Sequence, residues 1–485
     1  MGNGNRPEPA SGPTSGPVSG PEQGTGGPEL RVLLENGEYW LNNKGDLAIL
    51  DISVRRVAER LPQARVGVLT SAPALLRAYQ PDVDPICFQR AGRWPRRRRA
   101  GTPLRLAGPE LSGPVMNGWD AVTALPARLA RRVWGQPAPR NPARGPALAR
   151  DGGTVPDAVA TASVVVAIGG GYLTDIDRFQ TSRTLALLEL ATDRGIPTAM
   201  TGQGIGPLRD PYLLEHAARV LPRVDLIALR EGVRGPGLLR SLGVSDDRVV
   251  VTGDDAVELG WSTRRDALGH DIGLCLRVAE YSPVAAARQA AVGRVVREVG
   301  AETRAGLVPL VVSEHESEDR RATLPLLEGY PGAAPPLGRF ASARSLSTRV
   351  SRCRVVVTGA YHVAVFALSQ GIAVVGLSTS RYYDDKFDGL AAMFGTGVEL
   401  VRLDDDGLED RLRDAVRRQW AAAPQSRAAL LDRAVAQIDA SHAVFDRIRD
   451  LAQGRERSPS TPAHPGAGLR TPPTPPGGAG KSEGP

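Results

Sequence analysis

Two glycine-rich strand ends constrain the fold of this chain more than any other feature. An apolar, β-branched run at residues 163–168 leads into Gly169, Gly170 and Gly171, and a second cluster, Thr201-Gly-Gln-Gly-Ile-Gly-Pro207, follows one helix-length segment later. A continuous apolar run is typical of a strand covered on both faces in a parallel sheet. The clusters therefore predict neighbouring strands of one βαβ unit, whose carboxyl ends meet at the edge where open α/β sheets bind ligands.

The glycines at these strand ends are candidate ligand contacts. Because glycine has no Cβ, a phosphate or carboxylate can approach the main-chain N–H groups, and the positive end of the following helix adds attraction. Gly204 and Gly206 join the triplet at 169–171 in this set. The alternative is that these glycines only form tight turns, but a second cluster one βαβ unit later favours the ligand interpretation.

Strand-like and helix-like segments alternate twice along the chain, which predicts the α/β class with two Rossmann-like domains facing across a cleft. We place the domains at residues 30–262 and 263–405, followed by closing helices at 406–452. Apolar side chains at Leu408 to Trp420 and at Leu430 to Phe445 indicate two such helices. The expected strands lie at residues 31–35, 65–70, 163–168, 226–229, 271–278, 306–312, 354–358 and 373–377, and the clearest helices at 46–61, 181–194 and 285–299.

Three further segments fall outside this pattern. Residues 1–29 and 453–485 are rich in Gly, Pro and Ser, so they are expected to be disordered tails. Residues 90–150 hold 13 arginines and two acids, a local net charge of +11 in a chain of +7, so the remainder sums to −4. We interpret this Arg- and Pro-rich segment as a flexible insertion and as the candidate region for peripheral contact with a polyanion or an acidic lipid surface. Its few aromatic residues argue against nucleic acid as a partner.

The cysteines and the hydropathy pattern bear on location. Three cysteines, Cys87, Cys275 and Cys353, are scattered and odd in number, which argues against a disulfide framework or a zinc site. No secretory signal is expected at the N-terminus, and no window approaches the roughly 20 apolar residues of a spanning helix. A soluble cytoplasmic protein is the simplest expectation.

A third special strand end lies in the second half of the chain. The run at residues 355–358 is followed by Gly-Ala-Tyr361-His362 and then by a helical apolar segment, so His362 is expected at a helix N-terminus, exposed at the sheet edge. A histidine there can donate to an anion or pass a proton near neutral pH. The alternative is a helix-capping, partly buried histidine.

Lysine is rare in this chain, and two lysines lie in expected loops. Only Lys44, Lys386 and Lys481 occur, against 57 arginines. Lys44 lies in the loop after the first strand, and Lys386 lies just past the strand that follows His362. An ammonium is a compact point charge suited to a phosphate, whereas a solvated surface lysine is the alternative.

The order of these motifs resembles the polysaccharide pyruvyl transferase family. The resemblance rests on the early Asn-Gly…Gly-Asp loop, the Gly-Gly-Gly-Tyr-Leu-Thr-Asp175 stretch, the 202–207 glycines, the strand-end Arg230-Glu231, Leu239-Arg-Ser-Leu-Gly-Val leading to Gly253-Asp-Asp, and the late Tyr-His…Lys-Phe block. It covers residues 31 to about 403. It implies a fold like that of GT-B glycosyltransferases, phosphoenolpyruvate as the donor, and a sugar of a surface glycan, free or lipid-linked, as the acceptor.

This resemblance also suggests roles for the candidate residues. Arg230 and Lys386 are expected to bind the donor phosphate and carboxylate, and His362 to act as general acid. Asp46 and Asp175 are candidate bases or acceptor partners, with helix capping and loop capping as the respective alternatives. Further substrate contacts are expected from Arg381, Lys44, Tyr361 and the glycines named above; no metal and no cofactor are expected.

One departure and two rival functions remain open at this point. Family members commonly carry an arginine two positions before the motif histidine, where this chain has Ala360. Either another cation such as Arg381 or Lys386 meets the donor charge, or this branch has changed its donor. A glycosyltransferase that uses a sugar nucleotide would have the same two-domain cleft and could bind the ribose through Asp384 or Asp385. A non-catalytic subunit of glycan assembly is the other alternative.

Overall fold

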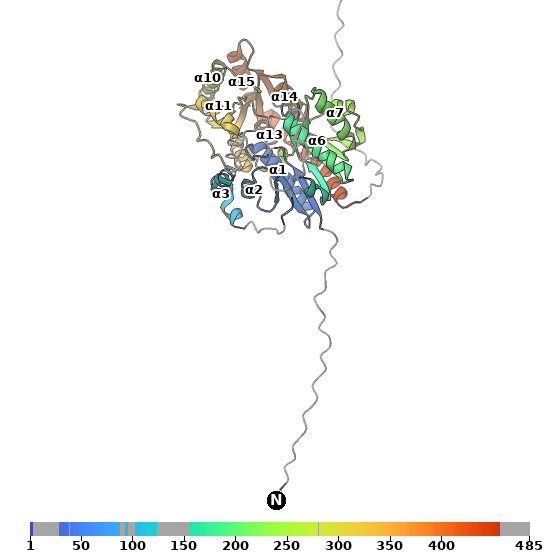
Figure 1. Cartoon of the computed structure of the whole chain (residues 1–485). Helices are drawn as coiled ribbons and strands as arrows, with labels where there is room; N and C mark the ends of the chain where they lie inside the picture. The colour runs from blue at the N-terminus through green and yellow to red at the C-terminus, as the bar shows by residue number, and fades with distance from the viewer. Residues whose placement is uncertain are drawn as a thin grey trace, which may run out of the picture.

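The structure, a computed structural model, describes residues 1–2, 29–37, 39–87, 93–95, 102–123, 155–279 and 281–455. It contains two parallel β-sheets with helices packed around them (Figure 1). The first sheet has the strand order β3-β2-β1-β4-β6-β7-β8, with β5 paired to β6, and the second has the order β10-β9-β11-β12-β13. The predicted α/β class with two parallel sheets is confirmed.

The strands agree closely with the apolar runs of the sequence. In the first sheet they are β1 (Arg31–Glu35), β2 (Arg65–Thr70), β3 (Asp84–Cys87), β4 (Val164–Ala167), β5 (Gly170–Leu173), β6 (Thr198–Ile205), β7 (Leu226–Leu229) and β8 (Val249–Val251). In the second they are β9 (Asp271–Cys275), β10 (Leu307–Pro309), β11 (Cys353–Thr358), β12 (Ala373–Ser378) and β13 (Val398–Arg402). Every ladder is parallel, as helical crossovers require.

The helices connect and cover these strands. They are α1 (Lys44–Arg60), α2 (Pro73–Tyr79), α3 (Thr102–Thr123), α5 (Val155–Ala160), α6 (Arg178–Asp193), α7 (Pro211–Val220), α8 (Gly235–Ser241), α9 (Ala256–Ser262), α10 (Ala286–Thr303), α11 (Glu318–Leu327), α12 (Ala343–Val350), α13 (Tyr361–Ser369), α14 (Arg381–Phe394) and α15 (Leu408–Ala452). Short 3₁₀ turns lie at Leu221–Arg223, Asp246–Arg248 and His315–Ser317.

One apolar core runs from the first sheet to the second. It includes Val32 of β1, Val356 of β11 and Phe366 of α13, all fully buried. α13 packs against α9, and these two helices approach so closely that a Cβ on Gly260 would lie 1.9 Å from the Oγ atom of Ser369. Because α1 also packs against α9, the first turns of α1 and α13 come together between the two sheets.

Two local expectations need correction. The cap of α1 is Asn43, whose side chain accepts from the Gly45 N–H, so Asp46 lies in the first turn and is not the cap. The expected pair of closing helices is one continuous helix, α15, with Pro424 inside it. The residues between Trp420 and Leu430 include Ala421, Ala422 and Ala423, strong helix formers that continue the helix where the apolar pattern pauses.

The predicted insertion and tails fall largely outside the described residues. Within 90–150 the structure describes the helix α3 (Thr102–Thr123), and the flexibility expected of the segment stays a prediction. The remaining residues of that segment, except 93–95, and the tails, except at their inner ends and residues 1–2, lie outside the described ranges. The domain boundaries stay a prediction, and the break placed after residue 262 coincides with the end of α9.

Candidate functional site

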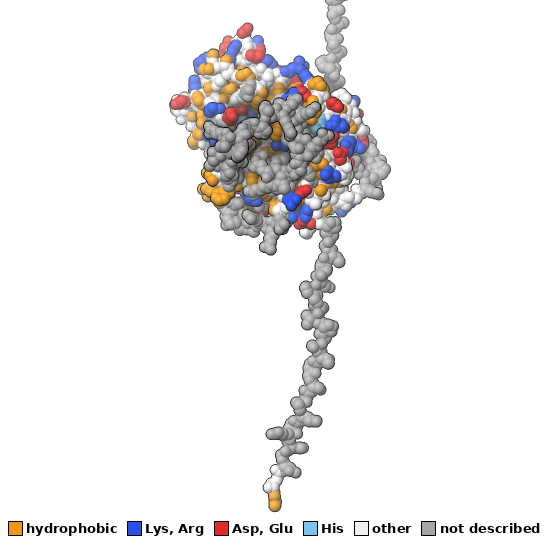
Figure 2. Space-filling view, in the orientation of Figure 1, with side chains coloured by type: hydrophobic (Ala, Val, Ile, Leu, Met, Phe, Trp, Pro, Cys, Tyr) orange, Lys and Arg blue, Asp and Glu red, His pale blue; other side chains and the backbone are white. Residues whose placement is uncertain are grey.

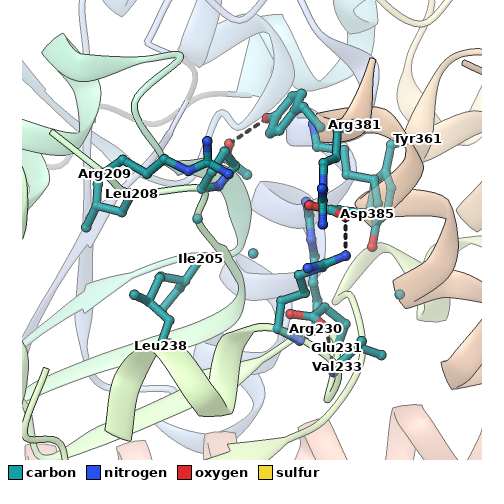
Figure 3. A pocket seen from close by; sticks show the side chains of 18 residues that line it. Ile205, Leu208, Arg209, Arg230, Glu231, Val233, Leu238, Tyr361, Arg381 and Asp385 are labelled. Atoms are coloured by element: carbon teal, nitrogen blue, oxygen red, sulfur yellow. Dashed lines mark hydrogen bonds and ion pairs between the residues drawn. The ribbon is translucent and has the colours of Figure 1, made fainter. Parts of the chain in front are cut away.

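Two adjoining cavities lie where strand ends of the two sheets face each other. The first, with a volume of about 220 Å³, is lined by Asp46, His362 and residues of both sheets, and we call it the His362 cavity. The second, of about 420 Å³, includes Arg381 and the 204–209 segment, and we call it the Arg381 cavity. They share Gly171, Arg230, Tyr361, Tyr382 and Lys386. Figure 3 shows the Arg381 cavity with Arg209 entering from one side and Arg381 from the opposite side.

His362 occupies the first turn of α13, as predicted, but it is buried. Its exposed fraction is 8%, because the first turn of α1 packs directly on the imidazole. A Cβ on Gly45 would lie 2.0 Å from its Nδ1 atom, so only glycine fits there without a shift. On its other side the Nε2 atom lies 3.7 Å from Oδ2 of Asp254, and neither atom has a hydrogen-bond partner in the described structure.

Asp254 was not assigned a role from the sequence, and the structure places it behind the imidazole. Its Oδ1 atom accepts the Ala256 N–H at 2.9 Å, which fixes the carboxylate at the start of α9. Burial alone would raise the pKa of Asp254, but His362 and Arg230 outweigh burial and lower it. The carboxylate therefore favours its charged form next to His362 and Arg230. The signal for it was the Gly-Asp-Asp motif at 253–255.

Arg230 follows the end of β7 and lies on the wall between the two cavities. Only 6% of its side chain is exposed, and its guanidinium carbon lies 4.1 Å from the centre of the Tyr361 ring. A Cβ on Gly204 would lie 2.5 Å from the Arg230 Nε atom. The glycine of the second cluster therefore makes room for this arginine, in addition to lining the cavity.

Lys386 lies on α14 and not in the expected loop. Its Nζ atom is 4.0 Å from the centre of the Tyr382 ring and 5.1 Å from that of Tyr383. No acidic side chain among the described residues forms an ion pair with it. Burial lowers the pKa of Lys386 well below its usual value, and the nearby Arg230 and Arg277 lower it further. The cavity therefore holds closely spaced cations that an anionic ligand would stabilise.

Asp46 lines the His362 cavity from the first turn of α1. Burial raises the pKa of its carboxyl, and the nearby His362 opposes that shift. A carboxyl with a raised pKa beside an imidazole is a pair that can exchange protons with a bound molecule. The structure thus brings Asp46, Arg230, His362, Lys386 and Tyr361 to one cavity.

Other predicted residues lie elsewhere. Lys44 is buried and pairs with Glu314 at 3.3 Å, and it donates to the Arg339 carbonyl, so it ties α1 to the second half of the chain instead of facing either cavity. Asp175 accepts the N–H groups of Arg209 and Asp210 at 2.7 and 3.1 Å, which is the loop-capping alternative. Gly171, Gly204, Gly206 and Arg381 line the Arg381 cavity, whereas Gly169 and Gly170 are not among the lining residues.

Four side chains at the site had no place in the sequence-based set. Arg277, Tyr281, Tyr382 and Tyr383 line the His362 cavity. The Arg277 Nη2 atom donates to Asp319 at 3.0 Å, and the Tyr382 hydroxyl donates across the cleft to the Gly171 carbonyl at 3.2 Å. Tyr382 and Tyr383 precede Lys386 within the Tyr-His…Lys-Phe block of the sequence. Only the fold shows that their rings lie next to the lysine ammonium. Among the described residues no group of His, Cys, Asp and Glu is arranged to hold a metal ion.

The arrangement suits a small molecule with two anionic groups and a site for proton transfer. Two cations can bind negative charge: Arg230, which lies 3.9 Å from Asp254, and Lys386, which has no ion-paired acid among the described residues. His362 and Asp46 can give and take a proton. None of the helices in the described ranges combines the length and apolarity needed to cross a bilayer.

Comparison with known proteins adds the family and the fold. The family model for polysaccharide pyruvyl transferase matches residues 43–381, which include Asp46, Arg230, Asp254 and His362, whereas Tyr382, Tyr383 and Lys386 lie just beyond its end. No curated protein sequence matches this chain.

Solved structures of similar fold share little sequence with this chain. One such structure is from Listeria monocytogenes and is named as a UDP-N-acetylglucosamine 2-epimerase. It superposes with a TM-score of 0.52 at 12% identity, and the match covers 88% of this chain and 98% of that one. The UDP-GlcNAc 2-epimerase of Neisseria meningitidis bound to UDP-GlcNAc has a TM-score of 0.50 at 12% identity, with 86% and 99% covered. Arabidopsis thaliana UGT89C1 complexed with quercetin also gives 0.50, at 11% identity with 87% and 99% covered. These similarities confirm the GT-B-like fold.

Proposed function

Because the chain belongs to the polysaccharide pyruvyl transferase family, we propose that it transfers pyruvate from phosphoenolpyruvate to a sugar of a surface glycan, forming a cyclic ketal. The observation that supports this proposal most is that Arg230, His362 and Lys386 line one cavity although they come from three separate elements. The donor carries two anionic groups, and the cavity offers two cations: Lys386 has no ion-paired acid among the described residues, and Arg230 has Asp254 at 3.9 Å.

The proposed reaction delivers one proton to carbon and removes two from hydroxyl oxygens. His362 delivers a proton to the methylene carbon of phosphoenolpyruvate, which becomes the methyl group. A sugar hydroxyl attacks the adjacent carbon, and the C–O bond to phosphate breaks, releasing inorganic phosphate. A second hydroxyl of the same sugar closes the ring. Of the two hydroxyl protons, one passes by way of Asp46 to the released phosphate, and the other replaces the proton that His362 gave up.

Arg230 and Lys386 act on the charges that this reaction moves. The phosphate gains negative charge as it leaves, and a fixed cation stabilises that charge without reorganising in the transition state. The ring of Tyr361 packs against the Arg230 guanidinium, and those of Tyr382 and Tyr383 pack against the Lys386 ammonium. The Asp254 carboxylate lies 3.9 Å from Arg230, which is too far for a hydrogen bond. This arrangement compensates for Ala360, which stands where relatives carry an arginine.

A sugar-nucleotide glycosyltransferase is the second candidate. The fold similarity to UDP-GlcNAc epimerases and to UGT89C1 is compatible with it. Its predicted ribose-binding acids are already engaged, however, because Asp384 pairs with Arg402 and Asp385 pairs with Arg234 at 2.5 Å. This pairing favours phosphoenolpyruvate as the donor.

Thermal denaturation with each donor separates these two functions. We expect phosphoenolpyruvate to raise the melting temperature, and UDP and UDP-sugars to leave it unchanged, because only a ligand that binds the native state stabilises it. Stabilisation by UDP alone would contradict the proposed donor.

Turnover by two variants decides between catalysis and a non-catalytic subunit. His362→Ala and Arg230→Ala are each expected to lower transfer to a glycan acceptor by about 10²-fold or more, the usual effect of losing an acid or a charge-stabilising group. Arg240→Ala is the matched control, because Arg240 is 64% exposed on α8 and lies outside both cavities. Unchanged turnover in both cleft variants would exclude the proposed roles.

A further inference from the structure

The helix α3 exposes four large apolar side chains to the solvent. A kink at Gly108, with φ of 65°, divides it, and Pro109 opens its second part. In that part Leu111, Val115, Trp119 and Val122 have exposed fractions of 73%, 65%, 64% and 65%. Their spacing of four, four and three residues places them on one face of the helix. We call these four side chains the α3 stripe.

A neighbouring face of the helix packs on the protein. Ser112 is buried, and a Cβ on Gly113 would lie 2.8 Å from the ring of Phe340. Met116 packs partly buried against the core. The four apolar side chains of the stripe therefore face the solvent, where an ordinary surface helix carries polar ones. Figure 2 shows the orange side chains gathered over the position that α3 has in Figure 1.

The composition of the surrounding sequence indicates what covers this stripe. Residues 90–150 carry 13 arginines against two acids, Glu110 and Asp120, whereas the rest of the chain has a net charge of −4. An apolar helix face within a basic stretch is the pattern of helices that lie in the interface of anionic membranes. Tryptophan, here Trp119, favours that interface as well. The helix is neither long nor apolar enough to cross the bilayer.

We propose that the α3 stripe docks on an anionic lipid surface. The four apolar side chains would enter the boundary between headgroups and acyl chains, while the arginines of the flanking sequence supply the attraction to the lipid phosphates. The docking is peripheral and reversible. It requires no part of the proposed catalytic cleft, so its test is independent of the proposed enzyme activity.

Vesicle co-sedimentation of the full chain tests this inference. We expect the protein to bind vesicles of equimolar phosphatidylcholine and phosphatidylglycerol, and to bind vesicles of phosphatidylcholine alone at least about tenfold more weakly. The double variant Leu111→Ser and Trp119→Ser should lower binding to the anionic vesicles about tenfold or more, because each exposed side chain adds apolar area to the bound state. Added salt should weaken binding by the wild-type chain, since it screens the arginines.

The matched control is Val435→Ser, an apolar side chain 40% exposed on α15. It should bind vesicles as the wild type does. Circular dichroism of the double variant should match the wild type, because the replaced side chains are exposed. Absence of binding to anionic vesicles, or equal binding by the double variant, would overturn the proposal. Light scattering tests the other occupant of the stripe. If the wild type is a dimer and the double variant is a monomer with unchanged vesicle binding, a second copy of the chain covers the stripe and the lipid proposal is wrong.

Discussion

At the level of single residues, the candidate site places charged side chains close together without hydrogen bonds between Asp254 and either Arg230 or His362. Arg230 and Lys386 rest against tyrosine rings, and Asp254 faces both His362 and Arg230 at 3.7 and 3.9 Å, outside hydrogen-bond distance. The Asp254 Oδ2 and His362 Nε2 atoms are buried and lack hydrogen-bond partners in the described structure. Buried polar atoms of this kind are rare unless a ligand completes them. The residues are therefore prepared for a charged molecule.

Lys386 should make donor affinity depend on pH. Burial, followed by Arg230 and Arg277, holds its pKa well below the usual lysine value in the free protein. Because the donor binds the charged ammonium, affinity is greatest below that pKa and falls as pH rises through it. The KM for phosphoenolpyruvate should therefore rise with pH in the wild type and rise less in Lys386→Arg, whose guanidinium stays charged. Parallel pH profiles of KM for the two proteins would contradict this role.

Glu35 should make the stability of the first sheet depend on pH. Burial raises its pKa from 4.5 to about 7, although Arg183 and the hydrogen bonds from Thr184 and Gln180 oppose that shift. The native state therefore holds this proton more tightly than the unfolded chain does. Its contribution to the free energy of unfolding is full below the unfolded pKa and declines by about 3 kcal/mol as pH rises to about 7.

The variant Glu35→Gln should remove that decline. Glutamine keeps one acceptor oxygen for Gln180 and Thr184, which donate to the Oε1 atom of Glu35 at 2.8 and 3.0 Å. Urea denaturation at about pH 5 and about pH 8 should show a smaller loss of stability with pH in the variant than in the wild type. An identical loss in both proteins would show that Glu35 is not the titrating group.

At the level of secondary-structure elements, the sequence predicted the site as far as local patterns allow. The strand ends, the helix after His362 and the strand end at Arg230 follow from apolar runs and glycine positions, and the structure confirms these elements. The burial of His362 did not follow, because it depends on α1 packing against α13 across the two halves. Lys44 was also misjudged, since its partner Glu314 lies 270 residues away in sequence. Contacts between distant segments carry no local signal.

The contact between α1 and α13 can be tested at one glycine. A Cβ at Gly45 would overlap the His362 imidazole, so Gly45→Ala should displace the ring and lower kcat by up to about 10²-fold. The matched control is Gly237→Ala in α8, where an added Cβ meets no atom within 4 Å. That control should keep full turnover and gain at most about 1 kcal/mol of stability. Equal turnover in Gly45→Ala and Gly237→Ala would show that the position of His362 is not critical.

At the level of the whole molecule, two parallel sheets share one core and meet again across the cleft. The Tyr382 hydroxyl reaches the Gly171 carbonyl, and Arg234 pairs with Asp385 beside the Arg381 cavity. The overall architecture was predictable, because alternating strands and helices restart after residue 261. That Arg277, Tyr281 and Tyr383 also line the His362 cavity could not be read from the sequence, because it depends on the relative placement of the two sheets.

The most direct test of the central claim is a crystal structure of the protein with phosphoenolpyruvate bound. We expect the donor in the His362 cavity, with its phosphate and carboxylate contacting Arg230 and Lys386 and its methylene carbon facing the imidazole of His362. Electron density for the donor at any site away from these three side chains would contradict the account.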